Sequence, residues 1–449
     1  MAYPAPAGVI VRAAPALSPA EAARRVSAGD DPIWLSSPGL DTPGGRDVAV
    51  DVVAAGPRVV VRGGALGALE DAWTAARARW RGAPGIPVGV GWLSYDLARA
   101  WIAVGGALET TPGDGFEFRF FDALWIRDVA TGTARVVACD EDAAARLEAL
   151  LARPAPPPTV PRIGPFQDAH GQEAHRQAVV RIKDYLLAGD AYQVNLARRL
   201  TAAMGEGDPL WLAAALRADT PAPHAVWMGA RRVSGGAIDS TVIGNSPERF
   251  LRLSPARELE TQPIKGTRPR SPDPQRDAAL RAELLASPKD RAEHVMIVDL
   301  ERNDLGRVCE IGSVRVHELM RVLELPTVFH LVSTVRGRLR ADVGLAELVR
   351  ACFPGGSVTG APKQRAMQII EELEPVRRGI YTGATGWLGA AGDLDLAVAI
   401  RTATVSDGTL SLFVGGGIVA DSEPATEWDE TEVKARAFRV ACDAAAGAE

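Results

Sequence analysis

The sequence predicts an α+β fold rather than a doubly wound parallel sheet. Segments with strand character occur in clusters, and the helical segments among them do not alternate with strands in a regular βαβ order. The 449 residues are 47% hydrophobic and 24% charged, which is typical of a globular protein with a large core. We therefore expect a mixed fold in which neither helices nor strands are a minor component.

The first 160 residues are expected to be rich in strands. Apolar or alternating segments at 48–53, 59–61 and 88–95 are separated by glycine and proline. Residues 153–161 read Arg-Pro-Ala-Pro-Pro-Pro-Thr-Val-Pro, and proline both removes amide donors and fixes φ. We interpret this stretch as a linker that separates the first 160 residues from a second region, 161–449.

The second region mixes long helices with strands. Apolar residues at helical spacing, together with capping residues, predict helices over 173–187, 274–286, 291–305 with Gly306 as C-cap, 363–373, and 423–445 with Asp421 or Ser422 as N-cap. Alternating or apolar runs predict strands over 192–200, 242–253, 394–405 and 409–414. No internal repeat is evident.

Composition argues against several classes of partner and compartment. Lys and Arg number 50 against 56 Asp and Glu, so a net charge of −6 provides no general footprint for nucleic acid. No run of about 20 apolar residues predicts a membrane helix, and the first twenty residues do not resemble a signal peptide. Because the four cysteines form no CxxC pair, neither a zinc site nor a disulfide framework is indicated, and we expect a cytoplasmic protein.

The last predicted helix carries an acidic stripe. Glu423, Glu427, Glu430 and Lys434 are spaced i, i+4, i+7 and i+11 and therefore share one face. A solvated face with Glu-to-Lys pairs is the commoner meaning of such a stripe. The alternative is a site for a hard cation beside an anion-binding lysine, because clustered carboxylates repel one another unless a metal or protons neutralise them.

Two glycine-rich runs are candidates for anion binding. Gly415, Gly416 and Gly417 join a strand to the acidic helix, where successive amides could approach an anion, although a flexible turn is the simpler interpretation. Residues 355–363 have the first spacing of a phosphate loop, but Ala361 stands where that motif requires lysine. A nucleotide-binding function is therefore not predicted.

Three further residues are candidates for chemistry. Lys265 lies in a short loop that could present its amine in a fixed direction, and Glu248 in Ser-Pro-Glu-Arg could be a general acid. Glu293 lies on a helix with an apolar stripe, so its carboxylate needs a partner, either a metal or an arginine. The commoner alternatives are a surface lysine for Lys265 and an arginine ion pair for Glu248.

Taken together, these segments resemble the chorismate-utilising enzymes, which include anthranilate, aminodeoxychorismate, isochorismate and salicylate synthases. The resemblance extends from about Tyr192 to Ala437, in family order, through 246–250, 263–268, 290–308, 330–334, 353–374, 399–401 and 415–434. It is weaker in the first half, through Trp34-Leu35-Ser36-Ser37 and 91–96. By analogy, both halves contribute strands to one body of layered antiparallel sheets flanked by helices.

The resemblance implies roles for individual residues. It implies that Glu293 and Glu430 hold Mg²⁺ on the ring carboxylate of chorismate, with Glu427 close by through water. It implies that the substrate's carboxylates are anchored by Arg401, Lys434 and the amides of Gly415, Gly416 and Gly417, and that the pocket is lined by Thr267, His330 and Tyr381. It also implies a two-step reaction in which Lys265 is the nucleophile and Glu248 protonates the departing C4 hydroxyl.

A few positions favour one branch of the family. Gln193 stands where the water-using members carry a lysine base, and because glutamine cannot deprotonate water, ammonia is the expected nucleophile. Lys265 and Thr359 replace the alanine and serine that are usual in anthranilate synthases, as they do in aminodeoxychorismate synthases. We therefore expect amination of chorismate at C4, with anthranilate synthesis as the alternative and a non-catalytic regulatory paralogue less favoured.

The ammonia is expected to come from another chain. None of the four cysteines lies in the glycine-rich nucleophile turn of a glutamine amidotransferase. A separate glutamine amidotransferase subunit, forming a heterodimer with this chain, is therefore the expected partner, in a route to p-aminobenzoate and folate.

Overall fold

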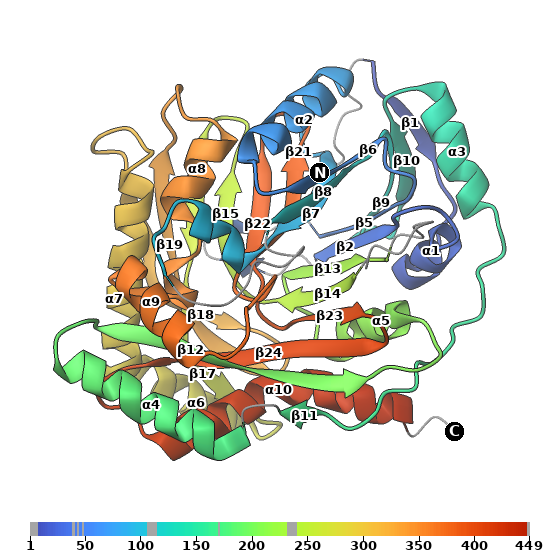
Figure 1. The fold of residues 1–449 in the computed structure, drawn as a ribbon. Coiled ribbons are helices and arrows are strands. Elements are labelled where there is room, and N and C mark those ends of the chain that lie inside the picture. The colour runs from blue at the N-terminus through green and yellow to red at the C-terminus, as the bar shows by residue number, and fades with distance from the viewer. Residues whose placement is uncertain are drawn as a thin grey trace.

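The chain forms two large antiparallel sheets surrounded by helices (Figure 1). The computed structural model describes residues 8–37, 41–42, 45–46, 49–105, 115–168, 171–230 and 240–446. Every strand pairing among these residues is antiparallel. The α+β class with layered antiparallel sheets is thus confirmed.

One sheet has twelve strands. Its order is β1 (Ile10–Ala13), β10 (Ala134–Ala138), β9 (Ala123–Asp128), β5 (Val50–Ala54), β2 (Ile33–Ser37), β13 (His224–Met228), β14 (Thr241–Ser246), β23 (Thr402–Ser406), β24 (Thr409–Ile418), β12 (Gln193–Ala203) and β11 (Gln167–Asp168), with β20 (Gly360–Ala361) paired to β12.

The other large sheet has ten strands. Its order is β17 (Ile264–Pro269), β19 (Val328–Arg338), β16 (Glu258–Gln262), β15 (Arg249–Leu253), β22 (Leu394–Val398), β21 (Ala384–Gly389), β7 (Pro87–Leu93), β8 (Phe116–Phe120) and β6 (Val59–Gly63), with β18 (Arg315–Glu324) paired to β19. A separate pair joins β3 (Asp41–Thr42) to β4 (Gly45–Arg46).

Strands from both sides of residue 160 are neighbours in both sheets. In the twelve-stranded sheet β2 pairs with β13, with Trp34 opposite Trp227. In the ten-stranded sheet β7 pairs with β21, with Gly91 opposite Gly386. Each sheet is therefore completed only by strands distant in sequence.

Helices cover the outer faces of the sheets (Figure 1). Their bounds are α1 (Pro19–Val26), α2 (Leu66–Arg79), α3 (Glu141–Leu151), α4 (Gly171–Leu187), α5 (Pro209–Asp219), α6 (Pro274–Ala286), α7 (Pro288–Gly306), α8 (Leu345–Cys352), α9 (Lys363–Leu373) and α10 (Pro424–Ala446), with short 3₁₀ turns η1 (Tyr95–Ala100) and η2 (Gly356–Val358). A core cluster that includes Val52 of β5 and Val90 of β7 joins the two sheets. The acidic helix α10 packs on β24 and α4.

Two predicted strands are in fact pairs of strands in different sheets. The segment 242–253 divides at Pro247 and Glu248, so that β14 lies in the twelve-stranded sheet and β15 in the ten-stranded sheet. The segment 394–405 divides in the same way between β22 and β23, where Arg401 adopts a positive φ of 49°. The hydrophobic pattern continues across both crossings, so sequence periodicity alone does not indicate them.

Three further predictions about element boundaries were wrong. Helix α7 begins at Pro288, capped by the Ser287 hydroxyl, and Gly306 is its last residue while Arg307 is the C-cap. Helix α10 begins at Pro424, two residues after Ser422, so neither Asp421 nor Ser422 directly precedes it. The three glycines 415–417 belong to strand β24 rather than to a loop, because their backbone pairs with β12.

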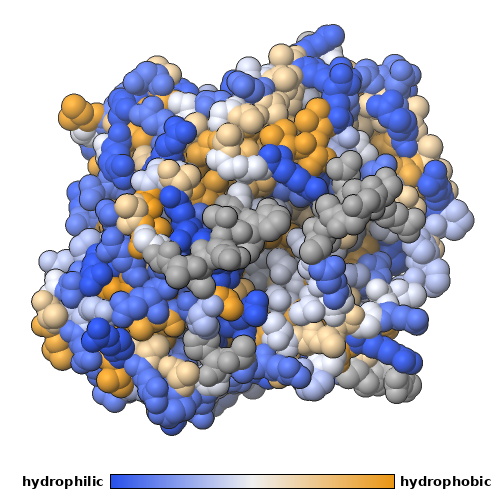
Figure 2. All heavy atoms as spheres, in the orientation of Figure 1, coloured by the Kyte–Doolittle hydropathy of each residue, from blue (hydrophilic) through white to orange (hydrophobic). Residues whose placement is uncertain are grey.

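The surface offers no continuous apolar belt on the face drawn in Figure 2, where hydrophobic residues form separate areas among hydrophilic ones. Within the part of the chain that the structure describes, every helix is too short or too polar to cross a bilayer.

Candidate active site

Glu248 and Arg401 lie where the chain passes from one sheet to the other. The two crossings are tied together by backbone hydrogen bonds: Val398 N donates to Glu248 O at 3.0 Å, and Asn245 N donates to Arg401 O at 3.0 Å. The Ser246 hydroxyl adds a bond of 2.6 Å to Val398 O. The backbone at the predicted general acid and at the predicted carboxylate anchor is therefore held in one fixed arrangement.

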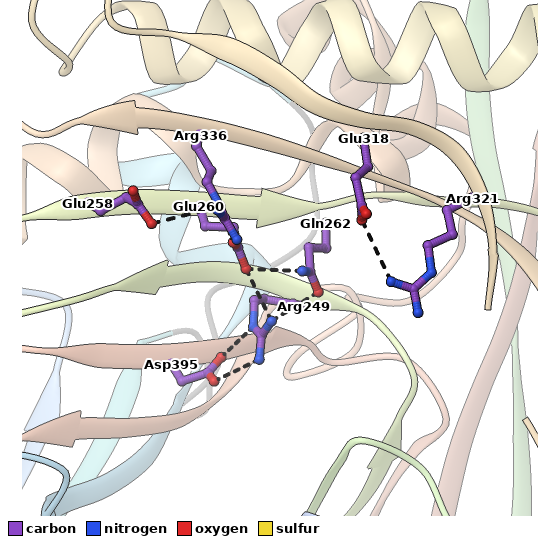
Figure 3. A network of polar contacts seen from close by, with 8 residues as sticks. All are labelled: Arg249, Glu258, Glu260, Gln262, Glu318, Arg321, Arg336 and Asp395. Carbon is purple, nitrogen blue, oxygen red and sulfur yellow. Dashed lines mark hydrogen bonds and ion pairs between the residues drawn. The ribbon is translucent and has the colours of Figure 1, made fainter. Parts of the chain in front are cut away.

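A buried ionic network fixes the strand that follows Glu248 (Figure 3). The Arg249 guanidinium bonds both carboxylate oxygens of Asp395 at 3.1 Å and also reaches Glu260 at 3.2 Å. Gln262 accepts a further bond from Arg249 at 2.9 Å, and Arg336 contacts Glu260 at 2.6 Å from the other side. Bidentate arginine pairs have fixed geometry, so this network holds β15, β16, β19 and β22 in register beside the acid.

The carboxyl group of Glu248 is buried and only partly satisfied. Its side chain is 5% exposed, and its Oε1 has no hydrogen-bond partner among the described residues. Burial raises the pKa of Glu248 to about 7, against the opposing effects of the Ser357 hydroxyl and the positive charge of Lys265. A carboxyl group with such a pKa holds a proton near neutral pH and can donate it.

Lys265 lies on β17 next to a bulge and points toward the glycines of β24. The pairing of β17 with β19 shifts between Lys265 and Thr267, and the intervening Gly266 has a φ of 73°. A Cβ on Gly417 would lie 3.0 Å from the Lys265 Nζ and 3.0 Å from the Gln193 amide, so the glycine leaves room for both groups. Loss of surrounding water lowers the pKa of Lys265, which favours the neutral, nucleophilic amine.

Gln193 contributes a second unsatisfied group beside that amine. Its side chain is fully buried, and neither atom of its amide has a hydrogen-bond partner among the described residues. Buried polar groups are normally paired. The unpaired amide beside Lys265 and the unbonded oxygen of Glu248 are two buried polar groups that a polar ligand could satisfy.

The three predicted metal ligands lie near one another on two helices. Glu293 is on α7, while a Cβ on Gly416 would lie 3.3 Å from an oxygen of Glu427 and 3.4 Å from one of Glu430. Burial raises the pKa of Glu293 and of Glu427. Lys434, 2.6 Å from Glu430, lowers the pKa of that carboxylate.

The oxygens of Glu293, Glu427 and Glu430 are not close enough together for all three carboxylates to bind one ion directly. Their oxygens are not all within 4.8 Å of one another; in the described chain only Asp122, Cys139 and Asp140 meet that spacing, and Arg79 already pairs with both of those aspartates. Mg²⁺ usually keeps several waters and binds through one or two carboxylates plus substrate oxygens.

Several of the predicted anion-binding residues contact one another or act on one another's charge. Thr267 Oγ1 lies 3.0 Å from His330 Nδ1, and burial lowers the pKa of His330 to about 3, assisted by the charges of Arg401 and Lys434. Lys434 donates to the Gly415 carbonyl at 2.7 Å. The Arg401 guanidinium has no ion pair within the residues that the structure describes, so its charge is available to a carboxylate.

Beyond Leu412, one edge of the glycine strand has no paired strand among the residues that the structure describes. β23 pairs with β24 only as far as Leu412, whereas β12 continues to Ile418. Amides that face the unpaired edge beyond Leu412 are therefore not used by the sheet. Tyr381 stacks on Phe413 at 5.3 Å between ring centroids, which places that tyrosine at the same strand.

The sequence did not indicate two residues that the structure places near Glu248. Ser357 is buried, and its hydroxyl lies beside the Glu248 carboxyl. Glu301 on α7 is buried and close enough for the charge of Glu248 to act on it. The signal for Ser357 was the glycine-rich run 355–363, whose Lys363 turns out to pair with Asp304 at 2.7 Å rather than with a ligand.

Comparison with known proteins identifies the kind of chain that carries this site. Residues 32–440 match the family model described as chorismate binding enzyme. An aminodeoxychorismate synthase component 1 of Klebsiella aerogenes is 48% identical over 292 residues, covering 65% of this chain and 63% of that protein. An anthranilate synthase component 1 of Streptomyces coelicolor is 42% identical over 375 residues, covering 78% of this chain and 72% of that one.

A longer match is found in an aminodeoxychorismate synthase of Streptomyces griseus, which is 37% identical over 453 residues and covers 91% of this chain. The matches span 63% of the Klebsiella protein and 60% of the Streptomyces griseus protein.

Solved structures share the fold. Anthranilate synthase component I from Streptococcus pneumoniae superimposes with a TM-score of 0.69 at 27% identity, over 96% of this chain and 92% of that one. The menaquinone-specific isochorismate synthase of Escherichia coli superimposes with a TM-score of 0.77 at 21% identity, over 97% of this chain and 94% of that one.

Proposed function

Because the chain belongs to the chorismate-binding enzyme family, we propose that it aminates chorismate at C4 to give 4-amino-4-deoxychorismate. The proposed donor is ammonia from a separate glutamine amidotransferase subunit, in a route to p-aminobenzoate and folate. The enzyme is then a transferase of the aminating type. Its proposed location is the cytoplasm.

The observation that carries this proposal is a half-buried lysine amine that faces Gly417 and Gln193 and whose charge acts on a buried acid. Lys265 has a lowered pKa and stands beside Gln193, while Glu248 has a pKa raised to about 7. A nucleophilic amine must be neutral, and a general acid must carry a proton. The two pKa shifts favour these states in Lys265 and Glu248. Relatives named aminodeoxychorismate synthase component 1 in Klebsiella aerogenes and Escherichia coli support the same branch.

The proposed reaction divides a difficult substitution into two steps. In the first, the neutral Lys265 amine bonds to C2, the two ring double bonds shift to C1=C6 and C4=C5, and the C4–O bond breaks. Glu248 gives its proton to the departing hydroxyl, which leaves as water. In the second step ammonia bonds to C4, the double bonds return, and the C2–N bond breaks to release Lys265, while Glu248 recovers a proton from the new ammonium group.

Binding and orientation of the substrate would be the task of the charged residues around this pair. We propose that Arg401, Lys434 and the free amides of β24 hold the substrate's carboxylates, and that Thr267, His330 and Tyr381 line the pocket. The neutral His330 ring can exchange a hydrogen bond with Thr267 without adding charge. Mg²⁺ held by Glu293 and Glu430, with Glu427 through water, would bind the ring carboxylate and draw electron density from the ring.

Anthranilate synthesis is the second candidate function, because the Streptomyces coelicolor relative with that name matches 78% of this chain. In that reaction ammonia itself becomes attached at C2. A lysine amine that bonds to C2 occupies the position that ammonia would need, so Lys265 favours amination at C4.

Incubation of the chain with chorismate, Mg²⁺ and ammonium, followed by chromatography, tests the assignment. We expect 4-amino-4-deoxychorismate, which yields p-aminobenzoate only after a separate lyase is added. Fluorescent anthranilate formed without any lyase would overturn the proposal in favour of the second candidate. Unchanged chorismate would instead indicate the non-catalytic paralogue.

A further inference from the structure

A fourth charged residue faces the acidic cluster formed by Glu293, Glu427 and Glu430. Lys289 lies one helical turn before Glu293 on α7, with its Nζ 3.9 Å from a Glu293 oxygen. Its side chain is 52% exposed, whereas that of Glu293 is 17% exposed. The ammonium group therefore reaches the edge of the cluster from the solvent side.

The charge of Lys289 acts on all three carboxylates. Burial raises the pKa of Glu293 and of Glu427, and Lys289 opposes the rise in both. At Glu430, Lys434 is the main cause of a lowered pKa, and Lys289 contributes in the same direction. Among the described residues, Glu293 is the one carboxylate of the three within ion-pair distance of Lys289, so the charge of Lys289 acts on Glu427 and Glu430 from farther away.

Local helix chemistry does not explain a lysine at this position. Lys289 lies in the first turn of α7, where the exposed amides and the helix dipole favour acidic side chains such as Asp290. A cation there is disfavoured unless negative charge nearby compensates. The carboxylate cluster supplies that charge.

The other lysines of the site cannot leave it as readily. Lys434 is held by both Glu430 at 2.6 Å and the Gly415 carbonyl at 2.7 Å. Lys265 is half-buried, with its amine against Gly417 of β24. Lys289 has only the long contact to Glu293 among the described residues, and a long flexible side chain that is half in solvent loses little on moving away.

We propose that Lys289 is a stand-in cation, whose ammonium neutralises the acidic cluster when no metal is bound and withdraws into solvent when Mg²⁺ enters. The inference rests on the proposed Mg²⁺ site and adds a competitor for it. It follows that Lys289 weakens Mg²⁺ binding while stabilising the metal-free protein. Together with Lys434 and Lys265, Lys289 then offsets the charge of the three carboxylates while the metal is absent.

The test compares Lys289→Met with a matched control. Arg302→Met removes one positive charge from the same helix, at a side chain that is 48% exposed and paired with Asp299 at 2.9 Å, away from the cluster. Metal-free full-length protein is titrated with MgCl₂ by isothermal calorimetry at low ionic strength, because salt screens such contacts. Melting temperatures are measured with and without Mg²⁺, which gives a readout independent of turnover.

Lys289→Met is expected to bind Mg²⁺ about three- to fivefold more tightly than the wild type, in line with the small energies of half-exposed ion pairs. Its metal-free form should melt at a lower temperature, and the rise on adding Mg²⁺ should be larger. Arg302→Met should match the wild type in Mg²⁺ affinity. If Lys289→Met binds Mg²⁺ no more tightly than the wild type, the stand-in role is wrong while the metal site remains. If the wild type takes up no Mg²⁺, both proposals are wrong.

Discussion

The Thr261 hydroxyl donates a hydrogen bond to the buried carboxyl group of Glu301, beneath the site and within reach of the charge on Glu248. Burial raises the pKa of Glu301 to about 8, against the opposing effect of that hydrogen bond. The folded protein therefore holds a proton on Glu301 that the unfolded chain releases near pH 4.5. It follows that the contribution of Glu301 to the free energy of unfolding falls progressively as pH rises from about 4.5 through about 8.

Glu301→Gln should remove that cost, because glutamine keeps a similar shape and does not ionise. We expect the urea midpoint of the wild type to fall more between pH 5.5 and pH 8.5 than that of the variant. The difference should correspond to roughly a few kcal/mol in the free energy of unfolding. Glu283→Gln, at a side chain 60% exposed, serves as the control and should follow the wild type. Parallel pH slopes for Glu301→Gln and the wild type would contradict the assignment.

Removal of either proposed metal ligand should abolish most turnover without unfolding the chain. Glu293→Gln and Glu430→Gln are each expected to lower turnover at least about a hundredfold, since a bound metal supplies several kcal/mol of charge stabilisation. Glu423→Gln is the matched control, because Glu423 directly precedes α10 and its side chain is 74% exposed. Equal activity in excess EDTA and in Mg²⁺ would show that the metal assignment is wrong.

Lys265 should form a covalent adduct with chorismate. Wild-type protein incubated with chorismate and Mg²⁺ but no ammonia is expected to show a mass increase on the peptide that contains Lys265. Lys265→Arg keeps a positive charge but lacks a nucleophilic amine, so it should show neither adduct nor amination. Full amination by Lys265→Arg would leave only an electrostatic role for the lysine.

The pH dependence of adduct formation should report the proton on Glu248. Adduct formation needs a protonated Glu248 and a neutral Lys265, so its rate should stop rising near pH 7, where Glu248 ionises, and should fall once Lys265 has also lost its proton. Measuring the adduct avoids the change in free ammonia with pH. Glu248→Gln should be strongly impaired and should lose this falling limb. A rate that keeps rising to pH 9 in the wild type would be inconsistent with Glu248 as the acid.

The source of ammonia can be tested with the purified chain alone. Ammonium salts at higher pH should support amination, because more free ammonia is then present. Glutamine should support it only after a glutamine amidotransferase subunit is added. Glutamine-dependent product from the single chain, free of other proteins, would refute the separate partner.

Local sequence signals anticipated much of the fold but not its long-range pairing. The helix over 363–373 was predicted with the bounds of α9, because its apolar spacing is strong and Pro362 precedes it. The division of 242–253 and 394–405 between two sheets was not predicted, because buried strands on either side of a crossing have the same apolar character. Pairing of β2 with β13 joins residues almost two hundred positions apart, which no local pattern specifies.

The sequence indicated the candidate site through a family resemblance rather than through local patterns. Lys265, Glu248 and Glu293 lie in separate elements, and only the resemblance to a family placed them together. Their burial and the unpaired amide of Gln193 depend on packing, so the sequence alone could not reveal which of these side chains lack partners. Lys289 was not singled out because a lysine near a helix start looks like an ordinary surface residue.

The paired crossings fix the backbone positions of Glu248, the proposed acid, and Arg401, the proposed anchor, through the scaffold rather than through side-chain choice. Since Val398 bonds to Glu248 and Asn245 bonds to Arg401 through main-chain atoms, these bonds do not depend on the side chains at 248 and 401, provided that residue 401 tolerates its positive φ of 49°. The chemistry at the crossings can therefore change by substitution while the frame stays constant. Such a frame suits a lineage in which one architecture serves several nucleophiles, because new reactions require new side chains and no new backbone.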